Sequence, residues 1–185
     1  MNHLPRSPLT PRIRAATSAD HPAIRRVVAD AFGSDAEADL VERIRTSVEY
    51  ESSMDLVADV DGRGVVGHVM ISRAVLQSDT ERSIVMLSPL AVAPAVQGRG
   101  IGSALVRAST DIAGRRGEPL VVLEGDPRYY SRFGFEPATA HGIVLPLPDW
   151  APPEAAQVML LAEYDLTDPT LRGAVRYPAA FDGLD

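Results

Sequence analysis

The chain of 185 residues contains neither cysteine nor lysine, and all 18 of its basic residues are arginine. Without cysteine there are no disulfides, no thiolate nucleophile and no cysteine-ligated metal centre. Without lysine there is no Schiff-base catalysis and no Gly-Lys-Ser/Thr phosphate loop. These two absences exclude several common kinds of catalytic and phosphate-binding site.

Positive charge and long apolar runs are also scarce. The formal net charge is −7, which disfavours broad binding to nucleic acid because such binding depends on basic residues that neutralise phosphates. An acidic surface suits a cationic or amine substrate better. No apolar run reaches the ~20 residues needed to cross a bilayer, and residues 1–6 lack an apolar signal core. We therefore expect a cytoplasmic protein that binds neither nucleic acid nor a membrane.

Length and composition are typical of one globular domain. Hydrophobic residues make up 45% of the chain and charged residues 23%, close to the usual values for soluble domains. Residues 1–11 hold three prolines among small polar residues and are expected to form a loose leader. Residues 12–185 are then expected to form a single domain. For the assembly, a homodimer is the default expectation.

Hydrophobic periodicity predicts an alternation of strands and helices. A strand over 13–15 is expected to precede helices over 17–33 and 36–46. Asp61-Gly62-Arg63-Gly64 then predicts a hairpin, because Asp-Gly tolerates positive φ. Further strands are expected over 55–60, 65–76, 84–92, 120–123, 135–138, 141–145, 158–165 and 174–177, and helices from 101 to the glycines at 114–117 and over 129–133. The strand, turn, helix and strand over 84–123 predict a parallel pair with a right-handed crossover.

A glycine-rich turn, Gln97-Gly98-Arg99-Gly100-Ile101-Gly102, lies between a predicted strand and a predicted helix. Glycine permits positive φ, and the free N–H groups of a helix's first turn attract an anion such as phosphate. Pro89 interrupts the preceding strand and predicts a bulge or an opening of the ladder. The spacing G-x-G-x-G differs from the dinucleotide fingerprint G-x-G-x-x-G. A tight strand-to-helix connection without a ligand remains the alternative.

Two motifs together resemble the GNAT acetyltransferase superfamily. Gln97-x-x-Gly100-x-Gly102, after a broken strand, resembles the acyl-CoA turn of that family, and Tyr129-Tyr130-Ser131-Arg132-Phe133-Gly134-Phe135 resembles its tyrosine segment. The resemblance covers residues 13–165, and the stretches 87–92 and 176–181 are similar to the bacterial YhbS-like group. It implies an α/β (α+β) fold. The expected architecture is a single GNAT-like domain whose mixed central sheet has a bulged, splayed strand at the acyl-CoA site and helices on both faces.

The resemblance also implies a site. Backbone amides of the turn would hold the pyrophosphate of coenzyme A, with acetyl-CoA as co-substrate and no metal. The residues implied in binding it are Leu90, Ala91, Val92, Gln97, Gly98, Arg99, Gly100, Ile101, Gly102 and Ser103. Tyr130 would be the catalytic residue, because a phenol with a pKa of about 10 can donate a proton to the departing thiolate. The alternative for the tyrosine segment is that its rings only pack in the core.

The group that accepts the amine proton stays open. An alkylamine is almost entirely ammonium at neutral pH, so a carboxylate is expected nearby. Glu124 and Asp126 follow the predicted central strand and could act directly or through water, although Asp126 could instead cap the next helix. His68 and His141 are further candidates, each with a structural role as the alternative. No acidic residue lies in 84–92, where some relatives keep their base.

The leading hypothesis is an acetyl-CoA-dependent N-acetyltransferase that transfers the acetyl group directly to a primary amine in a ternary complex, because no cysteine can carry an acetyl intermediate. The acceptor would be a small-molecule amine or a protein N-terminus, bordered by residues 37–51 and 146–153. One alternative is a non-catalytic acyl-CoA-binding sensor or interaction module of the same fold. Another is an unrelated nucleotide-binding α/β domain.

Overall fold

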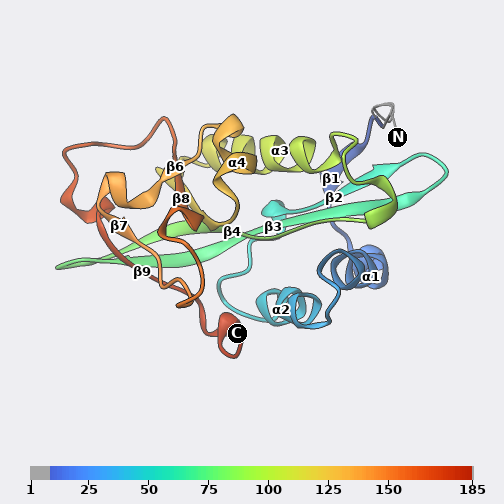
Figure 1. Ribbon diagram of the computed structural model, residues 1–185, viewed down its shortest axis with the longest axis horizontal. Helices are drawn as coiled ribbons and strands as arrows, with labels where there is room; N and C mark the ends of the chain where they lie inside the picture. Colours follow the sequence, from blue (N-terminus) through green and yellow to red (C-terminus); the bar gives the residue numbers. More distant parts are fainter. Residues whose placement is uncertain (1–8, 185) are drawn as a thin grey trace.

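One mixed β-sheet with helices on both faces makes up the computed structural model, which describes residues 9–184 (Figure 1). The helices are α1 (His21–Phe32), α2 (Ala36–Arg45), α3 (Ile101–Arg115) and α4 (Pro127–Tyr130). The strands are β1 (Arg12–Ala15), β2 (Asp55–Val60), β3 (Gly64–Gln77), β4 (Glu81–Val92), β5 (Leu120–Glu124), β6 (Glu136–Pro137), β7 (Ile143–Val144), β8 (Ala156–Leu160) and β9 (Gly173–Arg176). Most of the leader expected over 1–11 lies outside the described residues. No helix within 9–184 is long and apolar enough to cross a membrane.

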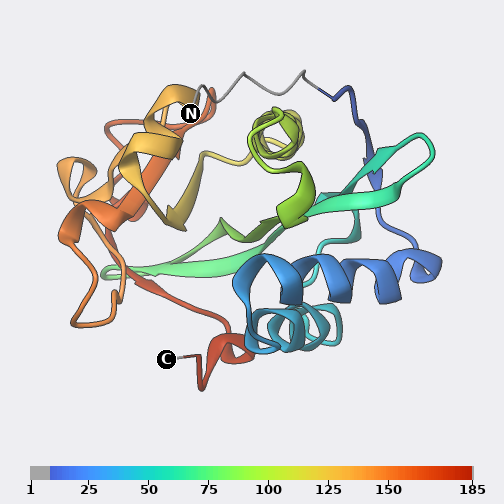
Figure 2. The ribbon, with the colours of Figure 1, turned by 45° about the vertical axis from the view of Figure 1, so that its right-hand side comes forward.

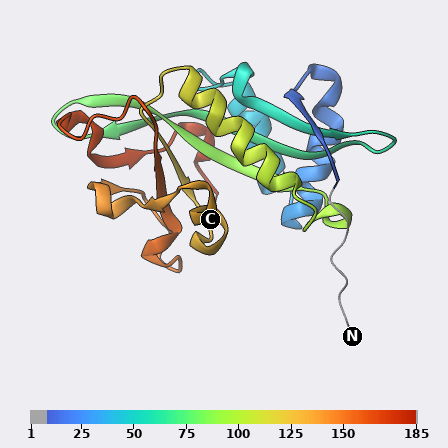
Figure 3. The same ribbon diagram turned by 90° about the horizontal axis from the view of Figure 1, so that it is seen from above.

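The strands follow the order β1-β2-β3-β4-β5-β8-β6. The first four strands pair antiparallel, and β4 and β5 pair parallel, as the predicted crossover through α3 requires. The late strand β9 returns to the far end of β3, where Val75 pairs with Arg176, and it also pairs with β7. Strand β9 therefore lies at the end of the molecule opposite the β2–β3 hairpin, and the segment after it continues toward α2 (Figures 1 and 3).

Helices cover the two faces unequally (Figure 2). On one face α3 packs over Leu56 and Ala58 of β2, while α1 and α2 cover the opposite face, where Val57 points. Gly67 of β3 permits the close approach of α3, because a Cβ there would lie 2.9 Å from Leu105 Cδ1. The start of α3 is thereby held directly against the strands that form the site.

β4 bulges in its second half and parts from β5. Across the β3–β4 pair, Val69 stands opposite Leu90 and Ile71 opposite Leu87, so Ser88 and Pro89 together face the single residue between them on β3. The Ser88–Pro89 peptide bond is cis. β5 pairs with β4 only at Val85 with Val121 and Met86 with Val122. The bulge predicted from Pro89 is confirmed, and the two central strands diverge beyond residue 86.

The late strands are shorter than the sequence pattern predicts. The strand expected over 135–138 is only Glu136–Pro137, because a 3-10 turn begins at Ala138. The strand expected over 141–145 is only Ile143–Val144, since that turn continues to His141 and Gly142 then takes a left-handed conformation. The strand expected over 158–165 is Ala156–Leu160, and a turn follows in which the Tyr164 amide donates to the Leu161 carbonyl.

A buried polar network fixes α2 to the sheet. The side chain of Asp55 is fully buried and accepts hydrogen bonds from Arg45 Nε (2.9 Å) and Tyr50 Oη (3.0 Å). Its other oxygen lies 2.8 Å from Nε2 of the buried His68. Burial lowers the pKa of His68, and the hydrogen bonds from His68 and Arg45 lower the pKa of Asp55 to about 2. The carboxylate is thus ionised and compensated by Arg45, the last residue of α2.

Arg45→Met is expected to destabilise the fold by about 3 kcal/mol, because it keeps much of the stem's packing but leaves the buried Asp55 charge without its guanidinium partner. Chemical denaturation at pH 7 measures this free energy of unfolding. The control is Arg25→Met, since Arg25 pairs with Asp39 and Glu42 at the exposed surface and such pairs contribute little. Equal unfolding midpoints for the two variants would show that the network does not stabilise the fold.

Candidate active site

The glycine-rich turn and the start of α3 line a cavity of about 410 Å³, here called the turn cavity. Gly98 (φ 73°) and Gly100 (φ 87°) adopt the left-handed conformation that the turn needs. Gln97 Nε2 donates to the Val92 carbonyl (3.0 Å), which closes the turn against the end of β4. The cavity is lined by Leu90, Val92, Val96, Gln97, Gly98, Gly100, Ile101, Gly102, Ser103, Tyr129 and Arg132.

Hydrogen-bond donors and a positively charged side chain lie at the turn cavity. The N–H groups of Ile101, Gly102 and Ser103 begin α3, where a helix has no internal acceptors and carries the positive end of its dipole. The guanidinium of Arg132 lies over the Tyr129 ring, with its carbon 4.2 Å from the ring centroid. Among residues 9–184 no carboxylate pairs with Arg132, whose Nε donates to the Tyr129 carbonyl (3.0 Å). This arrangement can bind an anion of the size of a diphosphate.

A second and larger cavity of about 710 Å³, the central cavity, lies where β4 and β5 part. Leu90 lines both cavities, so they adjoin at the bulge of β4. Residues from five segments line the central cavity: Phe32, Glu37 and Leu40; Met86, Leu87, Ser88, Pro89 and Leu90; Glu124, Gly125, Asp126 and Tyr130; Pro146, Pro148 and Trp150; Tyr177, Phe181 and Leu184. An elongated ligand in the turn cavity could therefore reach the central cavity along β4.

Tyr130 lies at the inner side of the central cavity. Its ring packs over Gly125, and a Cβ at that position would lie 2.8 Å from Tyr130 Cδ2. Phe135 meets the ring edge-on at 5.7 Å between centroids. Burial raises the pKa of Tyr130, so the phenol stays protonated at neutral pH. Within residues 9–184 its hydroxyl makes no hydrogen bond, which leaves it available to a ligand.

The two carboxylates that follow β5 have different partners. Asp126 caps α4 by accepting from the Arg128 amide (2.9 Å) and pairs with the Arg128 guanidinium, which lowers the Asp126 pKa. Glu124 accepts a hydrogen bond from the Tyr177 hydroxyl. No ion pair within residues 9–184 involves Glu124. Of these two carboxylates, Glu124 is therefore the one without a cationic partner.

Some residues expected at the site lie elsewhere. The Ala91 side chain is buried against the α1 and α2 face, and Ala91 lines neither cavity. Arg99 belongs to the turn but does not line its cavity. His68 lies in the buried network, and His141 pairs with Glu136 (3.2 Å). Within the described chain no group of three or more His, Asp or Glu side chains is placed to hold a metal ion.

Other residues of the site were not anticipated from the sequence. Tyr129 and Arg132 line the turn cavity, although the motif drew attention only to the neighbouring Tyr130. Phe32 and Tyr177 line the central cavity. The expected borders over 37–51 and 146–153 contribute through only a few side chains each, Trp150 among them. Proximity to the tyrosine motif was the available signal for Tyr129 and Arg132, and the similarity of 176–181 to the YhbS-like group was the signal for Tyr177, whereas Phe32 belongs to no motif.

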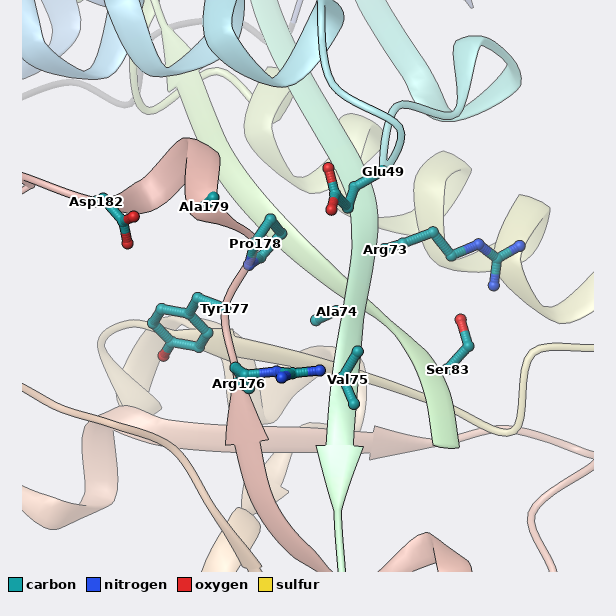
Figure 4. Close-up of a pocket in the computed structure, with 10 residues that line it drawn as sticks. All are labelled: Glu49, Arg73, Ala74, Val75, Ser83, Arg176, Tyr177, Pro178, Ala179 and Asp182. Atoms are coloured by element: carbon teal, nitrogen blue, oxygen red, sulfur yellow. The ribbon is translucent and has the colours of Figure 1, made fainter. Parts of the chain in front are cut away.

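A third cavity of about 460 Å³ lies beside β9 and β3, and its lining includes Arg73, Arg176 and Tyr177 (Figure 4). Its two cations are already paired: Arg73 with Glu51 and Glu118, and Arg176 with Glu81. Because its cationic groups are occupied, this cavity is less suited to binding an anion than the turn cavity.

The turn cavity at the start of α3, the parted parallel strands β4 and β5, and the half-buried Tyr130 beside them form one connected site. Comparison with known proteins gives the family. The family model described as Acetyltransferase (GNAT) domain matches residues 12–138. The chain belongs to this GNAT family and has its single-domain fold.

Relatives match over most of their length. The uncharacterized N-acetyltransferase YhbS of Escherichia coli K12 is 36% identical over 171 residues, covering 92% of this chain and 98% of YhbS. A crystal structure of E. coli YhbS in complex with CoA superposes with a TM-score of 0.80 at 34% identity, covering 97% of this chain and 96% of that one. A GNAT acetyltransferase from Brucella melitensis in complex with acetyl-CoA has a TM-score of 0.74 at 30% identity, covering 94% and 99%.

Gly125→Ala is expected to cost about 1–3 kcal/mol in stability, because the added methyl group overlaps the packed ring of Tyr130. The matched control is Gly114→Ala in α3, where a Cβ would meet no atom within 4 Å and the helix gains from alanine. Urea denaturation of both variants measures the difference. If Gly125→Ala is as stable as Gly114→Ala, the packing of the Tyr130 ring does not require glycine at position 125.

Proposed function

We propose that this protein is an N-acetyltransferase that moves the acetyl group of acetyl-CoA directly to a primary amine in a ternary complex. The observation that carries the proposal is the junction at Leu90 of an anion-binding cavity with a second cavity that contains a free tyrosine hydroxyl. Relatives that bind CoA and acetyl-CoA support this assignment of the donor. The chain has no cysteine to carry the acetyl group, which favours direct transfer.

In this proposal the turn cavity holds the donor. The pyrophosphate of CoA would accept hydrogen bonds from the N–H groups at the start of α3, with Arg132 supplying a positive charge. The pantetheine arm would run along β4 beyond residue 86, where β5 no longer pairs with it. Leu90 and Val92 would contact the arm through their side chains, and Ala91 through its backbone. The thioester would then lie in the central cavity near Tyr130.

The transfer step follows from the groups around the thioester. The neutral amine attacks the carbonyl carbon, so that a C–N bond forms and the C–S bond breaks. Tyr130 donates its proton to the departing thiolate of CoA, and its raised pKa keeps it in the protonated form needed for this role. Glu124, directly or through water, accepts the proton that the ammonium group loses before the attack, and the second proton that the nitrogen loses as the amide forms returns to the Tyr130 phenolate. Asp126 is less suited to that role because Arg128 neutralises it.

Replacement of Tyr130 by phenylalanine tests the acid role. Removing a general acid is expected to lower kcat about 100-fold or more, while CoA affinity stays within about twofold. Release of free thiol from acetyl-CoA measures turnover with an amine, and calorimetry measures CoA binding. Unchanged turnover in the variant would refute the acid role of Tyr130. CoA binding without acetylation of any amine would instead indicate a non-catalytic acyl-CoA sensor.

The pH profile gives a second test of Tyr130. Because burial raises the Tyr130 pKa above the ordinary phenol value, the acid form persists as the pH rises through 10, the usual pKa of a phenol. We therefore expect kcat to rise with pH as the amine loses its proton, and to show no loss by pH 10. A decline in kcat centred below pH 10 in folded protein would contradict a protonated Tyr130 as the acid.

Arg132→Ala is expected to weaken CoA binding about tenfold or more, because a charge-assisted hydrogen bond to phosphate is lost. Arg107→Ala is the control: Arg107 also stacks on Phe133, with its guanidinium carbon 5.2 Å from the ring centroid, but it does not line the turn cavity. Titration calorimetry with CoA compares the two variants. Equal affinity of the two variants for CoA would show that Arg132 does not contribute to binding the donor.

A further inference from the structure

We propose that the acceptor is a primary monoamine with an apolar, preferably aromatic, body and no carboxylate. Glu124 would bind its ammonium group, and Tyr177 would be the positioning residue that holds Glu124. This inference rests on the proposed function and adds the class of acceptor. Three features of the central cavity carry it: its unbalanced negative charge, its exposed aromatic side chains and the contact between Glu124 and Tyr177.

Acidic groups line the central cavity. Its carboxylates are Glu37, Glu124 and Asp126, and none of the arginines or histidines in residues 9–184 lines it. Asp126 is neutralised by Arg128, and Glu37 accepts a hydrogen bond from Ser34 (2.9 Å) at the exposed start of α2. Glu124 is half-buried at the end of β5 with only a hydroxyl as its partner. A partly desolvated carboxylate of this kind favours a cationic ligand.

The same charge pattern disfavours acceptors that carry a carboxylate. An amino acid would bring a negative charge into a cavity that offers three carboxylates and no cation to receive it. A polyamine would bring further ammonium groups, for which the cavity offers only Asp126, already paired with Arg128, and Glu37 at the start of α2, while most of its other lining residues are apolar. Both classes should therefore be poorer acceptors than an amine with a single charge.

Aromatic side chains provide the apolar walls. Phe32 at the end of α1 is 45% exposed, and Trp150 in the loop after β7 is 80% exposed. These are the exposed large aromatic side chains of residues 9–184, and both line the central cavity. Phe181 of the C-terminal segment lines it as well. Aromatic surface left open to water beside a carboxylate matches a ligand with an apolar body and a charged end.

Tyr177 connects the C-terminal segment to Glu124. It follows β9, and Figure 4 shows its side chain and that of Arg176 extending to opposite sides of the segment. Its hydroxyl donates to Glu124 Oε1, and burial together with this carboxylate raises the Tyr177 pKa. The Phe181 ring, 5.5 Å away between centroids, supports the tyrosine ring. Tyr177 thus stays a hydrogen-bond donor and leaves Glu124 Oε2 for the ammonium group.

A panel of four amines tests the acceptor class with saturating acetyl-CoA and measurement of released thiol. Phenethylamine carries the proposed body and charge, phenylalanine adds a carboxylate, ethylamine lacks the body, and spermidine adds charges. We expect kcat/KM for phenethylamine to exceed each of the other three values at least tenfold. Mass spectrometry of the products confirms which amines are acetylated.

Two variants test the aromatic walls of the central cavity. Trp150→Ala is expected to raise KM for phenethylamine about tenfold and to change KM for ethylamine less than twofold. The control is Leu166→Ala, because Leu166 is 67% exposed but does not line the cavity; it should behave as wild type with both amines. An equal loss with the two amines in Trp150→Ala would overturn the role of the aromatic wall.

Tyr177→Phe tests whether Tyr177 positions Glu124, separately from any effect on folding. Without the donated hydrogen bond Glu124 is no longer held toward the ammonium group, so KM for phenethylamine should rise about tenfold, while KM for acetyl-CoA and the unfolding midpoint stay unchanged. An unchanged KM for phenethylamine would overturn the role of Tyr177. If amines are acetylated but phenylalanine or spermidine is preferred, the acceptor class is wrong and the transferase function stands. If bound acetyl-CoA acetylates no amine at all, the proposed function fails together with this inference.

Discussion

The separation of β4 from β5 is the constraint on which the rest of the site depends. The strands pair through Val85 and Met86 and then diverge, because the bulge at Ser88 and Pro89 turns β4 away and proline has no N–H to donate. Backbone groups of β4 beyond the last pair lack a strand partner on this side. Unpaired backbone groups favour a ligand or water that satisfies them. The opening therefore supplies both the space and the polar edge that an extended ligand needs.

The two faces of the sheet have different roles around this opening. On one face, Gly67 lets α3 approach closely, which brings the N–H groups at its start next to the end of β4. On the other face, the network of Asp55, Arg45 and His68 holds α2, whose first turn borders the central cavity. The opening thus lies between the helix start that we propose binds the pyrophosphate and the helical wall formed by α2, with Tyr130 in the central cavity.

Much of the framework could be predicted from local sequence patterns. Periodicity predicted α1, α2 and α3, the Asp61-Gly62 turn predicted the β2–β3 hairpin, and Pro89 predicted the bulge. These features depend on the residues within a few positions of one another. The late strands were predicted less well, because Pro137 and Gly142 favour turns where the apolar pattern alone suggested longer strands.

The acceptor side could not be predicted in the same way. Phe32, Trp150 and Tyr177 come from the end of a helix, a proline-rich loop and the C-terminal segment, and only the path of β9 back to β3 brings the last of them to Glu124. No local spacing encodes that return. The choice between Glu124 and Asp126 likewise depended on Arg128, which neutralises the second carboxylate. Contacts between distant segments therefore determine the part of the site that sets the acceptor.

A crystal structure of the protein with bound coenzyme A tests the central claim most directly. The account predicts the pyrophosphate at the N–H groups of Ile101, Gly102 and Ser103, the pantetheine arm between β4 and β5, and the sulfur within hydrogen-bonding reach of the Tyr130 hydroxyl. Coenzyme A bound outside the parted strands, or with its sulfur directed away from Tyr130, would contradict it.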